Sequence, residues 1–128
     1  MELSSQVRDA ELSGIPAWRM ITDPGIGFSK TTEQNLEILT GLSRVREEIA
    51  KNSLAVSHAP LLIGPSRKRF LGELCNRPVA TDRDPATVAS ITTGVLDGAD
   101  IVRVHNVRDN FDAVKLCDAI LGKTGFLT

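Results

Sequence analysis

The hydrophobic and polar positions of this chain alternate between short, mostly apolar runs and longer stretches with helical spacing. Three such runs lie at residues 18–22, 61–64 and 101–105. A run of four or five residues of this kind, bounded by loop signals, is typical of a strand buried in a parallel sheet. Between the runs, leucine, isoleucine and valine recur every three or four residues, which predicts amphipathic helices.

The longest helix is predicted between the first two runs, over about residues 32–50. Thr31 and Gln34 before it have the spacing of a capping box, and Gly41 weakens it slightly. Its buried stripe is expected to consist of Leu36, Leu39, Leu42, Val45 and Ile49.

Further helix signals flank the other runs. Asp84 and Pro85 predict an N-cap and a first helical residue, in a helix that ends near Gly98. An N-terminal helix is expected to stop at Gly14, and a short helix follows the second run and reaches Leu74. The residues that mark the last helix are Phe111, Val114, Cys117 and Ile120.

The predicted elements alternate as strand, helix, strand, helix, strand, helix. This order implies right-handed crossovers and a parallel sheet, so the fold class is predicted to be α/β. No internal repeat or linker interrupts the chain, and we expect one structural unit.

Charge and composition narrow the classes of function. The formal net charge is −1 and the longest basic cluster is residues 67–69, so no nucleic-acid partner is expected. No stretch approaches the roughly 18 apolar residues of a membrane span. The two cysteines form no Cys/His cluster, and no metal ligands are assigned. The first 14 residues look like neither a transit peptide nor a secretory signal, so the chain as written is expected to be cytoplasmic.

Polar side chains gather where the three predicted strands end. Asp23 closes the first strand, Ser66, Arg67 and Lys68 follow the second, and Arg103 and His105 lie near the end of the third. Active sites of parallel α/β folds lie at the carboxyl ends of the strands. We therefore expect these side chains to meet.

Each of these groups also has a purely structural interpretation. Arg103 and His105 share a strand face, where they require an anion or a ligand; alternatively, Arg103 pairs with Asp23 and His105 with a backbone carbonyl. Arg67 and Lys68 either add to an anion site at a helix N-terminus or are solvated basic residues at the start of a helix. Asp23 either binds a ligand or caps a turn, and Phe28 either borders a ligand or belongs to the core.

Together, three segments resemble the dihydropteroate synthase family. Residues 23–30 (DPGIGFSK), 64–68 (GPSRK) and 101–107 (IVRVHNV) resemble its sixth-, seventh- and eighth-strand motifs. The match runs from about residue 5 to residue 121, and three motifs in the right order and spacing are much more specific than any one alone. Asn106 departs from the family, which often has Asp there, and this removes a charge beside the anion site.

The resemblance implies a TIM (β/α)8 barrel, of which residues 1–128 would be a partial pterin-binding domain. They would form its C-terminal portion, the last three βα units. Mg2+ is implied as the family's cofactor, but the first-strand segment that helps to bind it is absent from this sequence. The similarity is to the fused plant-type enzyme, in which a pyrophosphokinase domain precedes the synthase and which is usually mitochondrial. Full-length family members are often homodimeric.

The family's reaction joins 6-hydroxymethyl-7,8-dihydropterin diphosphate to p-aminobenzoate, giving 7,8-dihydropteroate and pyrophosphate. By resemblance, the residues that bind the pterin are Asp23, Lys68 and Arg103. Those that border p-aminobenzoate are Phe28 and Ser66, and Arg103 and His105 hold pyrophosphate. The implied catalytic residues are Lys68, Arg103 and His105.

Two hypotheses of different classes follow. The chain is either part of a dihydropteroate synthase or a non-catalytic, truncated pterin-binding module. The family's early loops, including the first-strand segment, are absent from this sequence, which favours the second hypothesis for this polypeptide by itself. A third hypothesis is another pterin-binding barrel, such as a folate-dependent methyltransferase domain, and the Ser-Arg-Lys motif argues against it.

Overall fold

A computed structural model describes residues 2–28 and 30–123, so Ser29 of the first motif lies outside the described residues. The α-helices are α1 (Glu2–Leu12), α2 (Thr32–Leu39), α3 (Leu42–Asn52), α4 (Arg69–Cys75), α5 (Asp84–Leu96) and α6 (Val107–Ile120). The 3-10 helices are η1 (Ala17–Arg19), η2 (Val56–His58) and η3 (Ala80–Arg83), and the strands are β1 (Leu62–Ile63) and β2 (Ile101–Val102).

The strands are parallel, which confirms the α/β class. Leu62 pairs with Ile101 and Ile63 with Val102. On the other side of β1, Thr22 forms a single parallel bridge with Leu61. The spatial order therefore follows the chain: the segment at Thr22, then β1, then β2.

The strand predicted at residues 18–22 is wrong except at its end. Residues 17–19 form η1 instead, and only Thr22 joins the sheet, through bonds to Pro60 and Leu62. In this register the residues before Thr22 would have to pair with residues before Pro60. Those residues belong to η2, so they offer no extended partner.

The third strand is shorter than the predicted 101–105. The Arg103 N–H still donates to the Ile63 carbonyl at 3.0 Å, but the ladder ends there. Pro65 lies next on the neighbouring strand and has no N–H to donate. The His105 N–H donates to the Ser66 hydroxyl instead, at 3.1 Å.

The helix predicted over residues 32–50 is two helices. Its capping box at Thr31 and Gln34 is confirmed, but α2 ends at Leu39 and α3 begins at Leu42. A carboxylate distant in sequence explains the break, because Asp97 accepts a hydrogen bond from the Leu42 N–H at 2.7 Å and so caps α3. Of the predicted buried stripe, Leu39, Leu42, Val45 and Ile49 are buried. Leu36 is exposed.

The remaining helices confirm the predicted elements, with two corrections. Helix α5 is preceded directly by η3, so Arg83 rather than Asp84 is its N-cap. In α6, Cys117 is buried, whereas Phe111 and Ile120 are exposed. Gly14 has a positive φ and follows α1 as a stop signal.

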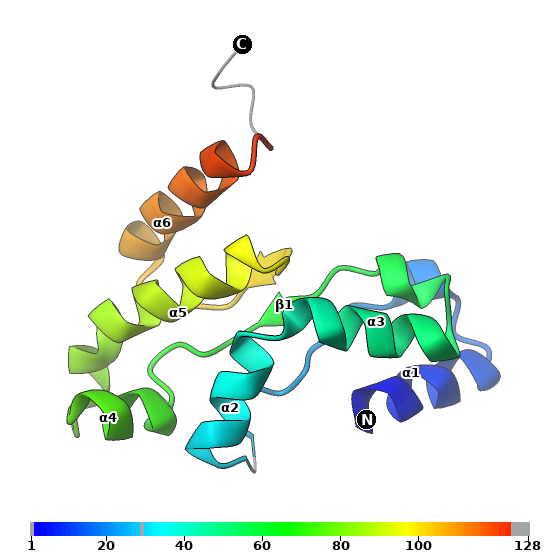
Figure 1. Cartoon of the computed structure of the whole chain (residues 1–128), viewed down its shortest axis with the longest axis horizontal. Coiled ribbons are helices and arrows are strands. Elements are labelled where there is room, and N and C mark those ends of the chain that lie inside the picture. Colours follow the sequence, from blue (N-terminus) through cyan, green and yellow to red (C-terminus); the bar gives the residue numbers. More distant parts are fainter. Residues whose placement is uncertain (1, 29, 124–128) are drawn as a thin grey trace.

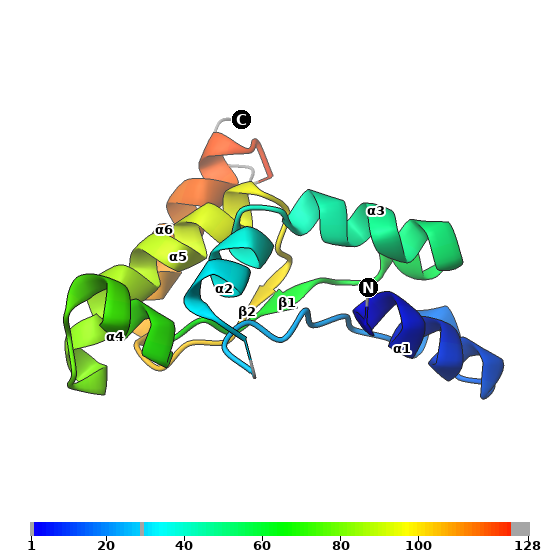
Figure 2. The ribbon, with the colours of Figure 1, turned by 60° about the horizontal axis from the view of Figure 1, so that its bottom comes forward.

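The core lies between the strands and the helices that cover them. Leu61, Ile63 and Ile91 are almost fully buried, and a Cβ at Gly94 would collide with the Ile63 side chain, so α5 packs closely on β1. Figure 1 shows α5 and α6 side by side at one end, and α1 next to α3 at the other. In Figure 2, helices α2, α3, α5 and α6 lie on one side of the strands. In the described part of the chain, no helix is long and apolar enough to cross a membrane.

Candidate active site

The loops after β1 and β2 meet through Ser66 and His105. The Ser66 hydroxyl lies 2.7 Å from His105 Nδ1 and also accepts the His105 backbone N–H. Ser66 is buried and the imidazole is exposed. The hydroxyl therefore contacts both the ring and the backbone of His105, in place of the backbone carbonyl considered for this residue.

Lys68 extends from the same loop across the first motif. A Cβ built on Gly27 would lie 2.7 Å from Lys68 Cδ, so the lysine stem passes directly over this glycine. Its Nζ lies 3.9 Å from the centroid of the Phe28 ring, a cation–π contact. Burial and the nearby Arg103 guanidinium lower the pKa of Lys68, while the Asp23 carboxylate opposes this shift. The other two predicted pterin residues, Asp23 and Arg103, thus both lie within electrostatic reach of Lys68.

Arg103 lies along the backbone of the neighbouring strand. A Cβ at Gly64 would come within 2.7 Å of the Arg103 guanidinium, so glycine provides the space for this side chain. Among the described residues, Arg103 and Lys68 take part in no ion pair. The alternative in which Arg103 pairs with Asp23 is therefore not what the structure shows. Two neighbouring cations without a carboxylate partner favour an anionic ligand.

Asp23 and Phe28 are both at the surface of the first loop. Asp23 Oδ1 accepts the Gly25 N–H at 2.8 Å, so the carboxylate does cap a turn. Phe28 is 54% exposed and is not part of the core. The positive φ of Gly27, 87°, lets the loop turn beneath Lys68.

Two hollows contain most of these side chains. One, of about 230 Å³, is lined by Gly64, Ser66, Lys68, Arg103, Val104 and His105. The other, of about 340 Å³, contains Asp23, Pro24, Gly25 and Lys30 with apolar side chains of α1, α2 and α3. Complete small-molecule sites commonly measure roughly 300–1,000 Å³. The first hollow is smaller than that, as expected for one wall of a larger site.

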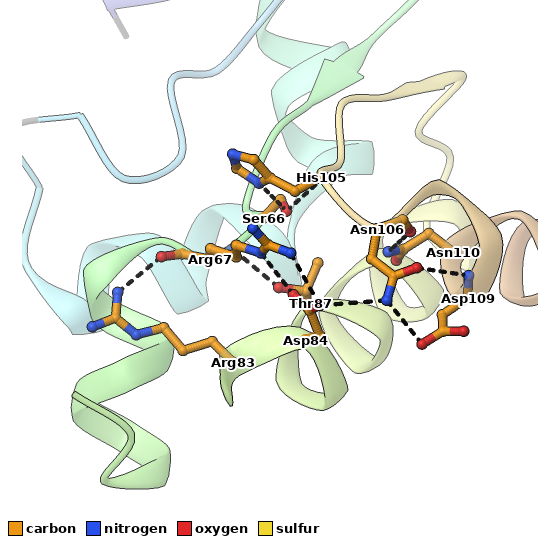
Figure 3. A network of polar contacts seen from close by, with 9 residues as sticks. All are labelled: Ser66, Arg67, Arg83, Asp84, Thr87, His105, Asn106, Asp109 and Asn110. Atoms are coloured by element: carbon orange, nitrogen blue, oxygen red, sulfur yellow. Dashed lines mark hydrogen bonds and ion pairs between the residues drawn. The ribbon is translucent and has the colours of Figure 1, made fainter. Parts of the chain in front are cut away.

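A polar network behind the site was missed by the sequence analysis (Figure 3). Arg67 forms a two-pronged ion pair with Asp84, at 2.8 and 3.2 Å. Its N–H donates to Thr87 Oγ1, and its carbonyl accepts from Arg83. In Figure 3 the His105 ring points away from the Arg67–Asp84 pair. Arg67 therefore binds α5, which corrects the expectation that it joins Lys68 among the side chains that meet at the strand ends.

Asn106 connects this network to α6. Its Oδ1 caps the helix by accepting the Asp109 N–H at 3.1 Å. Its amide nitrogen lies 3.0 Å from the Asp109 carboxylate and 3.4 Å from Asp84 Oδ2. An amide can donate to both carboxylates, whereas an aspartate would bring a third negative charge. This is a local reason for asparagine at a position where the family often has Asp.

One of these network residues had a readable signal. Asn106 stands three residues before Asp109 at the start of the last helix, the spacing of an N-cap. No signal in the sequence indicated the Arg67–Asp84 ion pair. Asp84 is followed by Pro85, and this pattern predicts a helix N-cap rather than an ion-pair partner.

A metal centre does not form from the described residues. They contain no group of three His, Cys, Asp or Glu side chains close enough to hold an ion.

The family model for pterin binding enzymes matches residues 1–105. The chain is 76% identical to the mitochondrial folate synthesis bifunctional protein of Pisum sativum, over 94% of this chain and 23% of that protein. It is 39% identical to the dihydropteroate synthase of Clostridium beijerinckii, over 94% of this chain and 41% of that protein.

Solved structures agree with the family match. A Yersinia pestis dihydropteroate synthase superposes with a TM-score of 0.80 at 30% identity, over 92% of this chain and 51% of that chain. The Xanthomonas albilineans synthase with 4-aminobenzoic acid gives 0.80 at 33% identity, over 94% and 42%. The chain thus spans about a quarter of the plant relative and about half or less of the bacterial enzymes. The chain belongs to the family of pterin binding enzymes.

Proposed function

We propose that this chain supplies the C-terminal part of a dihydropteroate synthase. Residues 1–128 would be a partial pterin-binding domain, formed by the last three βα units of a (β/α)8 barrel. The observation that carries the proposal is the convergence of Asp23, Lys68 and Arg103 from three neighbouring strand ends, in parallel order and without an ion pair for either cation. This arrangement suits a ligand with a flat polar edge and an anionic tail.

The pterin would lie between the first and second loops. Asp23 keeps one carboxylate oxygen on the Gly25 N–H, and the group can still accept from the two parallel donors of an aminopyrimidinone edge. The Lys68 ammonium, half-buried beside Phe28, would donate to the pterin carbonyl. Arg103 would cover the ring, because its guanidinium is planar and already lies close to Gly64.

The leaving group would be held by Arg103 and His105. In the reaction, the p-aminobenzoate amine attacks the methylene carbon of the pterin diphosphate, and the carbon–oxygen bond to pyrophosphate breaks. Negative charge then collects on the departing oxygen, where a guanidinium and an imidazole stabilise it. No covalent intermediate with the protein is needed, so these residues act by positioning and charge.

The p-aminobenzoate would be bordered by Phe28 and Ser66. Phe28 offers an exposed ring beneath the Lys68 ammonium, and Ser66 lies in the loop after β1. Ser66 has a second task in this arrangement, because its hydroxyl holds His105. Structures of related enzymes with a pterin diphosphate ligand abbreviated 6HMPPP and with 4-aminobenzoic acid support this class of substrates.

Mg2+ in the family would supply charge neutralisation at the diphosphate. By resemblance, the family's first-strand segment would help to bind it in a complete enzyme. Two of the plant relatives carry "mitochondrial" in their names, and we extend this location to a longer plant-type parent of the chain. A homodimer of that parent remains a prediction.

The test is to restore a complete barrel. The first part of the Pisum sativum protein, up to the point where the match begins, is fused in frame to this chain, and a second sample contains the chain alone. We expect dihydropteroate formation from the fusion and none from the isolated chain. Growth of cells that lack their own synthase, without folate-pathway end products, provides a second readout.

Two results would contradict the proposal. If the fusion folds and binds pterin but does not turn over, the chain is the non-catalytic module considered above. Turnover by the purified chain alone, after exclusion of host enzyme, would show that the remaining strands are not required.

A further inference from the structure

The loop between β1 and α4 depends on an unusual backbone conformation at Arg67. Its φ of 57° is in the left-handed region, which is unfavourable for a residue with a side chain. The residues on its two sides point to different partners. Ser66 contacts His105, whereas Lys68 crosses to Phe28. Any relaxation of Arg67 would therefore move both of these side chains.

A single segment of the chain, residues 83–87, holds this conformation. Thr87, which is 1% exposed, accepts the Arg67 N–H at 3.0 Å. Arg83 donates to the Arg67 carbonyl at 2.9 Å. Asp84 binds the guanidinium with both carboxylate oxygens, so that the side chain is fixed as well as the backbone.

Asp84 is the one member of this segment that also reaches the loop after β2. Its Oδ2 lies 3.4 Å from the amide nitrogen of Asn106, which directly follows His105 and caps α6. With side chains only 25% and 19% exposed, the Arg67–Asp84 pair is better shielded than the other ion pairs among the described residues. The Asp84 carboxylate thus contacts both ligand loops from behind (Figure 3).

We propose that Asp84 is a positioning residue of the ligand site, which acts through Arg67 on Lys68 and through Asn106 on His105. It touches no ligand. It holds the left-handed turn that sends Lys68 over Gly27, and it neutralises Arg67, so that the cations left for the ligand are Lys68 and Arg103. The effect of Asp84 on catalysis rests on the proposed function. Its effect on the position of Lys68 does not, and it can be measured in the 128-residue chain alone.

The experiment compares Asp84→Asn with a matched control, Asp100→Asn. Asparagine keeps the size of Asp84 but replaces one acceptor by a donor, which faces donors of Arg67 and Asn106. Asp100 forms an ion pair of similar length with Arg46, 2.9 Å, and lies before β2 at the other end of the strand. Both substitutions remove one ion pair, but only Asp84→Asn removes one that involves Arg67 of the loop between β1 and α4.

The first readout is the reactivity of the Lys68 amine. Traces of acetic anhydride are added to the dilute 128-residue chain over a range of pH, and acetylation of each lysine is followed by peptide mass spectrometry. We expect Lys68 to react with a midpoint below that of the other lysines. If Asp84→Asn releases Lys68 from its site, this midpoint should shift up towards theirs, whereas Asp100→Asn should leave it unchanged. A fall would reflect only the charge of the unpaired Arg67 and would also overturn the positioning role. The same midpoint in all three proteins would overturn the proposal.

The second readout is turnover of the fusion with the Pisum sativum segment. Asp84→Asn should lower kcat/KM by roughly tenfold or more, since misplaced catalytic groups cost rates of this order, while Asp100→Asn should not. Equal losses in the two variants would also overturn the positioning role, because they would reflect stability alone. An inactive parent fusion would instead count against the proposed synthase, and the Lys68 midpoint would still decide the role of Asp84.

Discussion

Arg67 and Lys68 are adjacent in the sequence but belong to opposite sides of the loop. Arg67 faces α5, where Asp84 neutralises it and Thr87 and Arg83 hold its backbone. Lys68 faces the strand ends, where it lies beside Phe28 and near another cation, Arg103. The outer network, formed by Arg67, Arg83, Asp84 and Thr87, pairs its charges internally and so contributes to stability. The inner cluster, formed by Asp23, Lys68 and Arg103, leaves its two cations available to a ligand. Basic residues of one motif therefore have to be assigned one by one.

The largest effects on turnover are expected from substitutions in the inner cluster. Lys68→Ala and Arg103→Ala, introduced into the active fusion, should each lower kcat/KM by roughly tenfold to a hundredfold. One charged contact is worth about 1.5–3 kcal/mol, which corresponds to rate changes of this size. Arg69→Ala is the control, because that side chain is 90% exposed and pairs only with Glu73 on the surface. If all three variants work equally well, the assignment of the inner cluster is wrong.

A smaller effect is expected from Gly27→Ala, which acts on Lys68 without changing its charge. The new Cβ would meet Lys68 Cδ at 2.7 Å and would be strained by the φ of 87°, at a cost of about 1–2 kcal/mol. Gly98→Ala is the matched control, since its φ is 109° but no atom lies within 4 Å of the new Cβ.

Chemical denaturation and steady-state kinetics separate the two glycines. Both variants should lose stability through backbone strain. Only Gly27→Ala should also lower kcat/KM, because only it displaces the lysine. Similar kinetics for the two variants would show that the close approach of Lys68 to Gly27 has no part in function.

In the outer network, loss of the Arg67–Asp84 ion pair should change the pH dependence of stability. Hydrogen bonds from Arg67 lower the pKa of Asp84, burial opposes the shift, and Asn106 adds to it. A carboxyl group with a lowered folded-state pKa stabilises the fold above its unfolded value, about 3.9, and this contribution is lost as the pH falls through the folded value. Urea unfolding between pH 7 and pH 2 should therefore show a steeper acid loss in the parent than in Asp84→Asn. Parallel curves would mean that the pair contributes nothing.

The smallest effect is expected for Asn106→Asp. Aspartate can still cap α6, but it cannot donate to Asp84 or Asp109 and adds a third carboxylate beside them. We expect a loss of about 0.5–1 kcal/mol at neutral pH, which shrinks as the carboxylates become protonated. A stability gain at pH 7, measured by thermal unfolding, would show that these carboxylates do not repel one another.

Local signals in the sequence were enough for the class of fold and for much of the inner cluster. The apolar run at residues 61–64 and the capping box at Thr31 and Gln34 became elements where they were predicted, because burial and capping depend on near neighbours in the chain. The same logic brought the residues after each run to one edge of the sheet, since parallel strands end together. Their roles toward a ligand stay predictions.

The tertiary structure decided what depends on partners distant in sequence. Asp97 divides the helix predicted over residues 32–50, and Pro65 ends the pairing of β2, each acting from another segment of the chain. The split between Arg67 and Lys68 has the same origin. Their side chains carry the same charge in the sequence, and only the position of Asp84 at the start of α5 determines which of them is neutralised.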